Sequence, residues 1–184
     1  MATPPASAPR GRQCGITLVE QIMVVALVGV LVAVAMPSLA RLFQRNRVQV
    51  AQADVIAALQ HARGAAIASG RPVLFCPSLD GLRCSGGTRW ESGWLIGQDQ
   101  DRDGQPDTIL RTHADYAGLT ILGDKGRPFV RFRSDGSASG MTNTLRFCGR
   151  GQPDQALVVV ISNVGRVRAD LASATDAASC AAAR

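Results

Sequence analysis

The feature that most constrains this chain is an uncharged apolar run near its amino terminus. From Gln21 to Ala40 no residue carries a charge, and most of the side chains are aliphatic. A helix of about 20 residues spans about 30 Å, which is the thickness of the hydrocarbon core of a bilayer. The run therefore predicts a segment that can cross a membrane.

The residues ahead of the run predict which side of the membrane receives the rest of the chain. Residues 1–15 carry Arg10 and Arg12 and no acidic residue. Because positive charge is retained on the cytoplasmic side, we expect the leader to be cytoplasmic and the remainder to be exported. A secretory signal peptide is the alternative, with a small-residue cleavage site at Ala33-Val34-Ala35 and a new amino terminus at Met36.

Three features favour a different kind of signal. Gly15 directly precedes Ile16, Glu20 stands at the start of the apolar run, and helical sequence continues past the run. An ionisable residue at membrane depth is costly and indicates a function. Gly15-Ile-Thr-Leu-Val-Glu20, followed by the apolar run and Pro37, resembles the class III signal of type IV pilins and pseudopilins.

The resemblance implies a processing step and an assembly role. In that family a prepilin peptidase cuts after the glycine and methylates the new amino terminus, here Ile16, where family usage favours phenylalanine. The family's glutamate and kinking proline match Glu20 and Pro37. In a filament core of low dielectric constant, we expect Glu20 to pair with the amino terminus of a neighbouring subunit.

The sequence after the apolar run predicts a long helix and then β structure. Helical character persists to Ser69, where Gly70 and Pro72 give a stop signal. Apolar residues at helical spacing predict the packed face, at Leu39, Leu42, Phe43, Val50, Ile56, Leu59 and Ile67. Short strands are expected at 72–76, 90–97, 108–111, 119–122, 129–133, 144–148 and 156–162. One long helix followed by antiparallel strands gives an α+β fold.

This pattern also predicts the organisation of the chain. About 140 residues remain after the leader and the membrane run, enough for one domain with a core of its own. The predicted segments are a prepilin leader at 1–15, a transmembrane and filament-core helix at 16–40, an amphipathic continuation at 41–70 and a β-rich globular domain at 71–184. Trp90 and Trp94 are expected in the core of that domain.

The cysteines predict disulfides in an oxidising compartment. The sequence has five cysteines, and loss of Cys14 with the leader leaves four. Three pairings of these four can be drawn. We favour one that closes a short loop and ties down the tail, which joins Cys76 to Cys84 and Cys148 to Cys180. Because neither histidine lies in a recognisable nucleophile pattern, we expect no enzymatic activity and no cofactor.

An aspartate-rich segment allows two interpretations. Asp99, Asp101 and Asp103 alternate and are followed by Gly104, like the start of an EF-hand calcium loop. The twelfth position, however, is Leu110 and not the expected glutamate. Turn chemistry explains the same residues, so we favour a hairpin loop without metal over a calcium site.

The carboxyl-terminal part of the chain carries the positive charge. From Gly126 onward, eight arginines stand against four acidic residues. Arg166 and Arg168 are two apart on an expected strand, so they should project together, with Val167 turned inward. Such a pair suits backbone phosphates. The residues that could widen the basic patch are Arg131, Arg133, Arg146 and Arg150. The alternative is that these arginines pair with Asp135, Asp154 and Asp170.

A second resemblance extends the first across most of the chain. Trp90, Gly93 and Trp94, the aspartate loop and Gly165-Arg-Val-Arg168 resemble the GspH/FimT group of minor pilins and pseudopilins. The Gly-Arg-x-Arg pattern resembles the FimT branch, which is implicated in binding DNA during natural transformation. The resemblance implies an inner-membrane protein with a periplasmic domain, assembled with other pilins into a periplasmic or surface filament.

Two functions are therefore predicted. The first is a minor type IV pilin that binds double-stranded DNA without sequence preference, through Arg166 and Arg168. The second is a purely structural tip or priming subunit of a type II secretion pseudopilus. Both predictions share the fold, the prepilin peptidase step and the membrane step.

Overall fold

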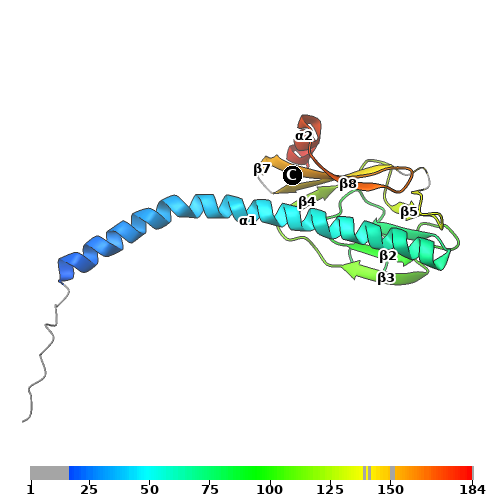
Figure 1. Ribbon diagram of the computed structural model, residues 1–184, viewed down its shortest axis with the longest axis horizontal. Helices are drawn as coiled ribbons and strands as arrows, with labels where there is room; N and C mark the ends of the chain where they lie inside the picture. Colours follow the sequence, from blue (N-terminus) through cyan, green and yellow to red (C-terminus); the bar gives the residue numbers. More distant parts are fainter. Residues whose placement is uncertain (1–16, 139, 141, 150–151, 184) are drawn as a thin grey trace, which may run out of the picture. The chain divides into compact units, whose positions relative to one another are not determined.

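The computed structural model describes residues 17–138, 140, 142–149 and 152–183. The chain forms a long helix, α1 (Leu18–Ser69), then strands, then a short helix, α2 (Ala174–Ala182), as Figure 1 shows. The strands are β1 (Val73–Pro77), β2 (Trp94–Gln98), β3 (Thr108–His113), β4 (Leu119–Leu122), β5 (Val130–Phe132), β6 (Asn143–Gly149), β7 (Gln152–Ile161) and β8 (Val167–Leu171). The predicted α+β class is confirmed.

Both ends of α1 follow from local sequence. Thr17 precedes the helix, and its Oγ1 accepts a hydrogen bond of 3.3 Å from the backbone N–H of Glu20. A hydroxyl in this position satisfies one of the N–H groups that have no partner in the first turn. At the other end Gly70 adopts φ +65°, a conformation that only glycine enters without strain. Pro72 then prevents the helix from continuing.

The first part of α1, residues 18–41, forms a unit of its own. Its side chains are exposed and mostly aliphatic. The helix α1 is long enough and contains a stretch apolar enough to cross a membrane. Pro37 lies inside the helix, and its carbonyl accepts a hydrogen bond of 3.3 Å from Arg41 Nε. Within the described residues of this unit, the segment has no apolar partner, as expected of a helix that is covered by lipid or by other subunits.

The described residues of the second unit, from Leu42 onward, form two antiparallel sheets of four strands each. The strand order in the first sheet is β3-β2-β1-β5, and in the second it is β4-β6-β7-β8. In the second sheet β7 pairs with β8 so that Val160 faces Arg168 and Ile161 faces Val167. Strand β8 is therefore an edge strand, and it follows β7 through a short turn.

The strands agree with the sequence prediction except at two places. Most predicted bounds lie within two residues of the observed ones, although β7 begins four residues earlier than expected. The strand predicted at 90–97 is wrong in its first half, because β2 begins only at Trp94. Gly93, with φ +118°, lies so close to His113 that a Cβ would be 2.5 Å from its carbonyl oxygen. The chain therefore turns before it enters the sheet.

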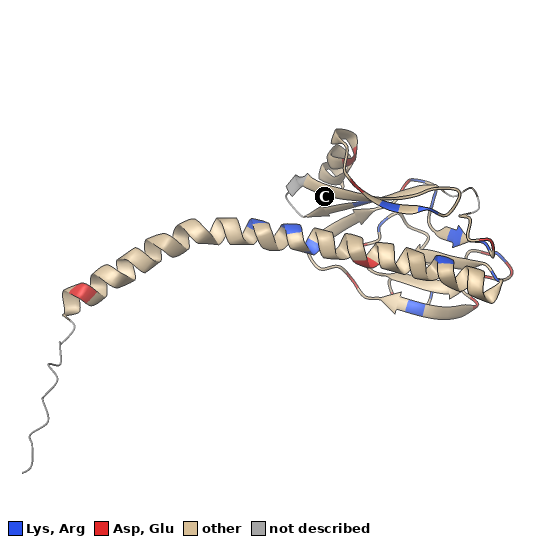
Figure 2. Cartoon of the chain, in the orientation of Figure 1, with Lys and Arg blue, Asp and Glu red and all other residues tan. Residues whose placement is uncertain are grey.

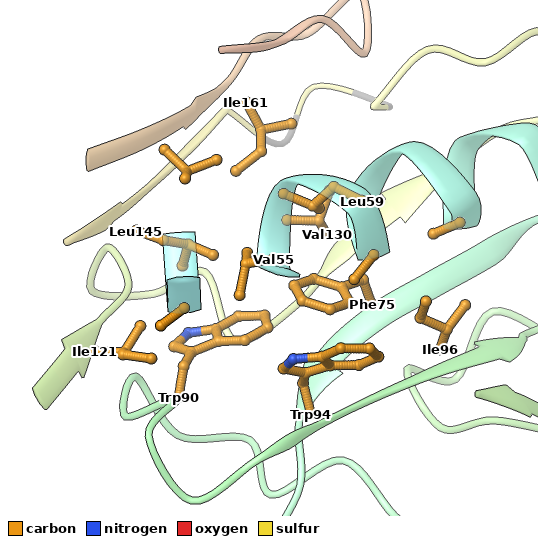
Figure 3. Packing of buried hydrophobic residues seen from close by; sticks show 14 of the residues in the cluster. Val55, Leu59, Phe75, Trp90, Trp94, Ile96, Ile121, Val130, Leu145 and Ile161 are labelled. Carbon is orange, nitrogen blue, oxygen red and sulfur yellow. The ribbon is translucent and has the colours of Figure 1, made fainter. Parts of the chain in front are cut away.

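The core of the second unit lies where α1 packs on the sheets. Trp90, Trp94 and Phe75 are almost fully buried against this helix, together with Val55 and Leu59 (Figure 3). The buried face of α1 differs from the predicted one and consists of Val48, Ala51, Val55, Ala58, Leu59, Ala62 and Ala66. Alanine has a small side chain, so it lets the helix backbone pack closely on the core. The prediction of packed residues is therefore wrong at five positions, which are all exposed: Leu39, Leu42, Phe43, Val50 and Ile67.

Two disulfides close the second unit. The structure joins Cys76 to Cys84 and Cys148 to Cys180, which are the two pairs favoured from the sequence. The second disulfide holds α2, which the sequence analysis missed, against β6. Ser173 caps this helix in a capping box, in which its side chain and that of Asp176 each accept a backbone N–H of the other. All buried core residues of the described chain lie between Val48 and Cys180, so residues 42–183 contain a complete core.

Candidate nucleic-acid interface

The candidate interface is built on the turn between β7 and β8. Gly165 N donates to Ser162 O at 2.8 Å, and Ser162 N donates to Arg166 O at 3.0 Å. The Ser162 hydroxyl also accepts a hydrogen bond of 3.2 Å from Arg166 N. These bonds close a tight turn in which Gly165 has φ +75°. A serine and a glycine at these positions are typical of such a turn.

The turn is fastened to the loop between β5 and β6. Ala138 N donates to Asn163 O at 2.9 Å. Gly165 lies so close to this loop that a Cβ added to it would be 1.9 Å from the carbonyl oxygen of Gly136. The same carbonyl accepts a hydrogen bond of 3.0 Å from Arg63 Nε of α1. Through these contacts the start of β8 is held against the rest of the domain.

Arg166 and Arg168 lie together on the outer surface of this structure. Both are exposed, and both line a hollow of about 290 Å³ together with Val160, Ser162 and Val164. Val167, between them, is half-buried and packs against the core. Figure 2 shows the basic segment on β8 in blue. The predicted arrangement, with two guanidinium groups on one side and a valine turned inward, agrees with this geometry.

The acidic residues that were candidates to neutralise this pair have other partners. Asp135 Oδ1 accepts the N–H of Ser137 at 2.8 Å, and hydrogen bonds from Ser137 hold the pKa of this carboxyl below its ordinary value. Asp170 Oδ1 accepts the N–H of Leu171 at 2.9 Å. Within the described part of the chain, neither Arg166 nor Arg168 forms an ion pair. Asp154 lies in β7, and its side chain is not among those that the structure describes.

Two residues of the proposed extension of the basic patch, Arg131 and Arg146, have acidic partners in the structure. The guanidinium of Arg131 is paired with Asp99, whose carboxylate is fully buried, and is itself only 15% exposed. Arg146 pairs with Asp124 at 2.9 Å and with Asp176 at 2.6 Å. Ion-paired guanidinium groups have their donors occupied and their charge balanced, so they add little attraction for phosphate.

The remaining two residues of that extension stay predictions. Arg133 is exposed just after β5, and its backbone N–H donates to Ser137 O at 2.8 Å within the turn that contacts Gly165. Arg150 lies outside the described residues.

The processing and assembly residues lie at the start of α1 or before it. Gly15 and Ile16 are outside the described residues, so cleavage between them stays a prediction. Glu20 is exposed in the first turn of α1. A carboxylate near a helix amino terminus is favoured by the helix dipole.

The aspartate loop brings together a different set from the predicted one. One carboxylate oxygen each of Asp99, Asp101 and Asp107 lies within 4.8 Å of the others. Asp103 instead accepts the N–H of Gln105 at 2.7 Å, as expected in a turn. The sequence analysis missed Asp107 because it stands eight positions after Asp99, beyond the run of alternating aspartates that resembles a calcium loop.

Comparison with known proteins agrees with this fold. The model of the family described as type II transport protein GspH matches residues 51–165. The crystal structure of the type IV minor pilin FimU of Pseudomonas aeruginosa is similar, with a TM-score of 0.57 and 25% identity over 71% of this chain and 92% of that one. The minor pseudopilin EpsH of Vibrio cholerae shares the fold at 16% identity, with a TM-score of 0.50 over 70% of this chain and 96% of that one. A comparison with curated protein sequences found no significant match.

The long apolar helix, the two sheets and these matches define the class, a type IV pilin-like protein of the minor pilin and pseudopilin type. More particularly, the chain belongs to the GspH family, because the family model matches more than half of it. Proteins of this family are structural subunits that assemble with other pilins or pseudopilins, and their apolar helix anchors them in the inner membrane.

Proposed function

We propose that this protein is a minor type IV pilin that binds double-stranded DNA without sequence preference, through Arg166 and Arg168, for uptake in natural transformation. The observation that carries the proposal is the pair of exposed guanidinium groups on one hollow, without an acidic partner in the described chain. An arginine presents a planar fork of donors that matches two phosphate oxygens.

The chemistry around the pair favours the DNA backbone over the bases. The residues that line the hollow besides the arginines are two valines and a serine. None of these is an aromatic platform for stacking or an amide side chain that reads a base edge. Contacts between arginines and backbone phosphates release counterions from the DNA, so binding weakens steeply as the salt concentration rises.

The processing and assembly steps complete the proposal. A prepilin peptidase cuts between Gly15 and Ile16 and methylates Ile16, and the protein is held in the inner membrane with its globular domain in the periplasm. The exposed apolar surface of α1 then joins the core of a filament that includes other pilins, where Glu20 pairs with the amino terminus of a neighbour. Residues 42–184 remain outside that core and present β8 to DNA.

A direct test is a fluorescence anisotropy titration of labelled duplex DNA with the domain, residues 42–184. We expect the variant Arg166→Gln/Arg168→Gln to bind at least tenfold more weakly than the wild type at low salt. The control is Arg45→Gln/Arg47→Gln, which removes the same charge from exposed positions on α1. This control should keep most of the affinity, because the contacts and not the net charge carry the binding.

Two outcomes would contradict the DNA proposal. Equal losses in the two double variants would show that the overall charge attracts DNA without a defined site. No binding by the wild-type domain even at low salt would leave the structural subunit of a type II secretion pseudopilus as the better proposal, in line with the name of the family.

A further inference from the structure

The loop between β2 and β3 contains an acidic cluster that the proposed DNA surface does not use. Asp99, Asp101 and Asp107 each place one carboxylate oxygen within 4.8 Å of the other two. Asp99 is fully buried, and Asp101 and Asp107 are exposed. Like charges this close repel one another, so the arrangement favours a positively charged ligand between them.

The buried carboxylate supplies a separate observation. Asp99 Oδ2 accepts both hydrogen bonds from Arg131, one from Nε at 2.8 Å and one from the terminal Nη2. Asp99 Oδ1 is equally buried, yet within the described residues it has no hydrogen-bond partner. A buried carboxylate oxygen without a partner is strongly destabilising. Oδ1 is therefore the oxygen of Asp99 that remains available to a ligand in the cluster.

The balance of charge indicates the kind of ligand. Three carboxylates and the guanidinium of Arg131 leave a formal charge of −2 around the cluster. A divalent cation neutralises this charge, whereas a water molecule satisfies the hydrogen bond but leaves the repulsion between carboxylates. The ligand atoms are all carboxylate oxygens, which suit hard cations.

We propose that this loop binds Ca²⁺ through Asp99, Asp101 and Asp107. These residues occupy positions 1, 3 and 9 of an EF-hand-like loop, and Gly104, with φ +88°, stands at position 6, where such loops turn sharply. Ca²⁺ accepts irregular sets of oxygen ligands, and the two exposed carboxylates leave room for water. Mg²⁺ requires a near-octahedral set of ligands.

The same residues set the expected strength of binding. Position 12 is Leu110, so the bidentate glutamate of a strong site is missing. Arg131 also competes for the charge of Asp99. The affinity therefore belongs to the range of extracellular calcium modules, with a dissociation constant on the order of 10⁻⁴ to 10⁻³ M. The bound ion connects an exposed loop to a carboxylate in the domain interior and so stabilises the loop.

The test is calorimetric titration of the full-length protein in detergent micelles, freed of metal, with CaCl₂ up to about 10 mM. The decisive variants are Asp107→Asn and Asp103→Asn, which remove the same charge four residues apart. Each asparagine keeps an oxygen for the backbone N–H that its aspartate accepts, from Gln100 and Gln105 respectively. Circular dichroism and the Tm in EDTA check that both variants fold like the wild type.

We expect one site in the wild type, at least a tenfold loss of affinity in Asp107→Asn, and less than a twofold change in Asp103→Asn. Addition of Ca²⁺ should raise the Tm of the wild type and of Asp103→Asn but not that of Asp107→Asn. Absence of binding by the wild type at 10 mM would overturn the proposal. Equal losses of calcium affinity in the two variants would also overturn it, as would Mg²⁺ binding as tight as that of Ca²⁺. If Asp107→Asn fails to fold, Asp101→Asn replaces it with the same expected loss.

Discussion

The substitution Gly165→Ala tests the contact that fixes the arginine-bearing turn. Gly165 has φ +75°, and an added Cβ would be 1.9 Å from the carbonyl oxygen of Gly136, well under the 3.0 Å that real Cβ contacts respect. Alanine in the left-handed conformation costs roughly 1–2 kcal/mol. Forcing the two loops apart by about an ångström adds roughly 1–3 kcal/mol, as in other overpacked sites. The free energy of unfolding should therefore fall by about 2–5 kcal/mol.

Gly126→Ala is the control, because Gly126 has the same φ of +75° and an added Cβ would meet nothing within 4 Å. This variant should lose only the conformational part, roughly 1–2 kcal/mol. The assay is guanidinium chloride unfolding of the oxidised domain, residues 42–184, followed by far-ultraviolet circular dichroism. Equal destabilisation by the two substitutions would refute the contact between Gly165 and Gly136 as the cause.

Three further predictions follow from other parts of the chain. Glu20→Ala should leave the protein in the membrane but block its incorporation into filaments, and normal incorporation seen by immunoblotting of sheared filaments would contradict the assembly role. The Ser173 cap and the Arg146 ion pair hold the pKa of Asp176 below its ordinary value of 3.8. The stability that this group contributes is therefore present above the unfolded pKa and is lost as the pH falls through the folded pKa. Measured by denaturant unfolding, the free energy of unfolding should fall less between pH 7 and pH 2 in Asp176→Asn than in the wild type. Cys148→Ser/Cys180→Ser opens a loop with a sequence separation of 32 and should lower the free energy of unfolding by about 3–4 kcal/mol in denaturant titrations, a change that would be absent if the bond did not form.

Local sequence signals predicted the elements of this fold well. The uncharged run, Gly70 and Pro72 indicate the helix and its end, and alternating apolar residues indicate most strands, because these signals depend on neighbouring residues alone. The packed face of α1 was predicted wrongly for a different reason. Large aliphatic residues are the most hydrophobic, whereas four of the buried residues of α1 are alanines, whose small side chains let the helix pack closely on the core.

The roles of the charged residues were harder to predict, because their partners are distant in sequence. Arg131 and Asp99 are 32 positions apart, and Arg146 and Asp176 are 30 apart. No local pattern indicates such pairs, so both arginines could be taken for surface residues. Arg166 and Arg168 were placed on one side of the chain correctly, because the period of a β-strand fixes their relation. The close approach of Gly136, which requires a glycine at 165, became visible only in the structure.

The most direct test of the DNA proposal is the salt dependence of binding, measured by anisotropy between 50 and 200 mM salt. Two phosphate contacts predict a slope of log K against log salt of about −1.8, which corresponds to roughly a tenfold loss of affinity over this range. Arg166→Gln and Arg168→Gln should each reduce the magnitude of the slope by about 0.9. An affinity that does not change with salt, or a slope that both variants retain, would contradict the assignment of these two arginines as the DNA contacts.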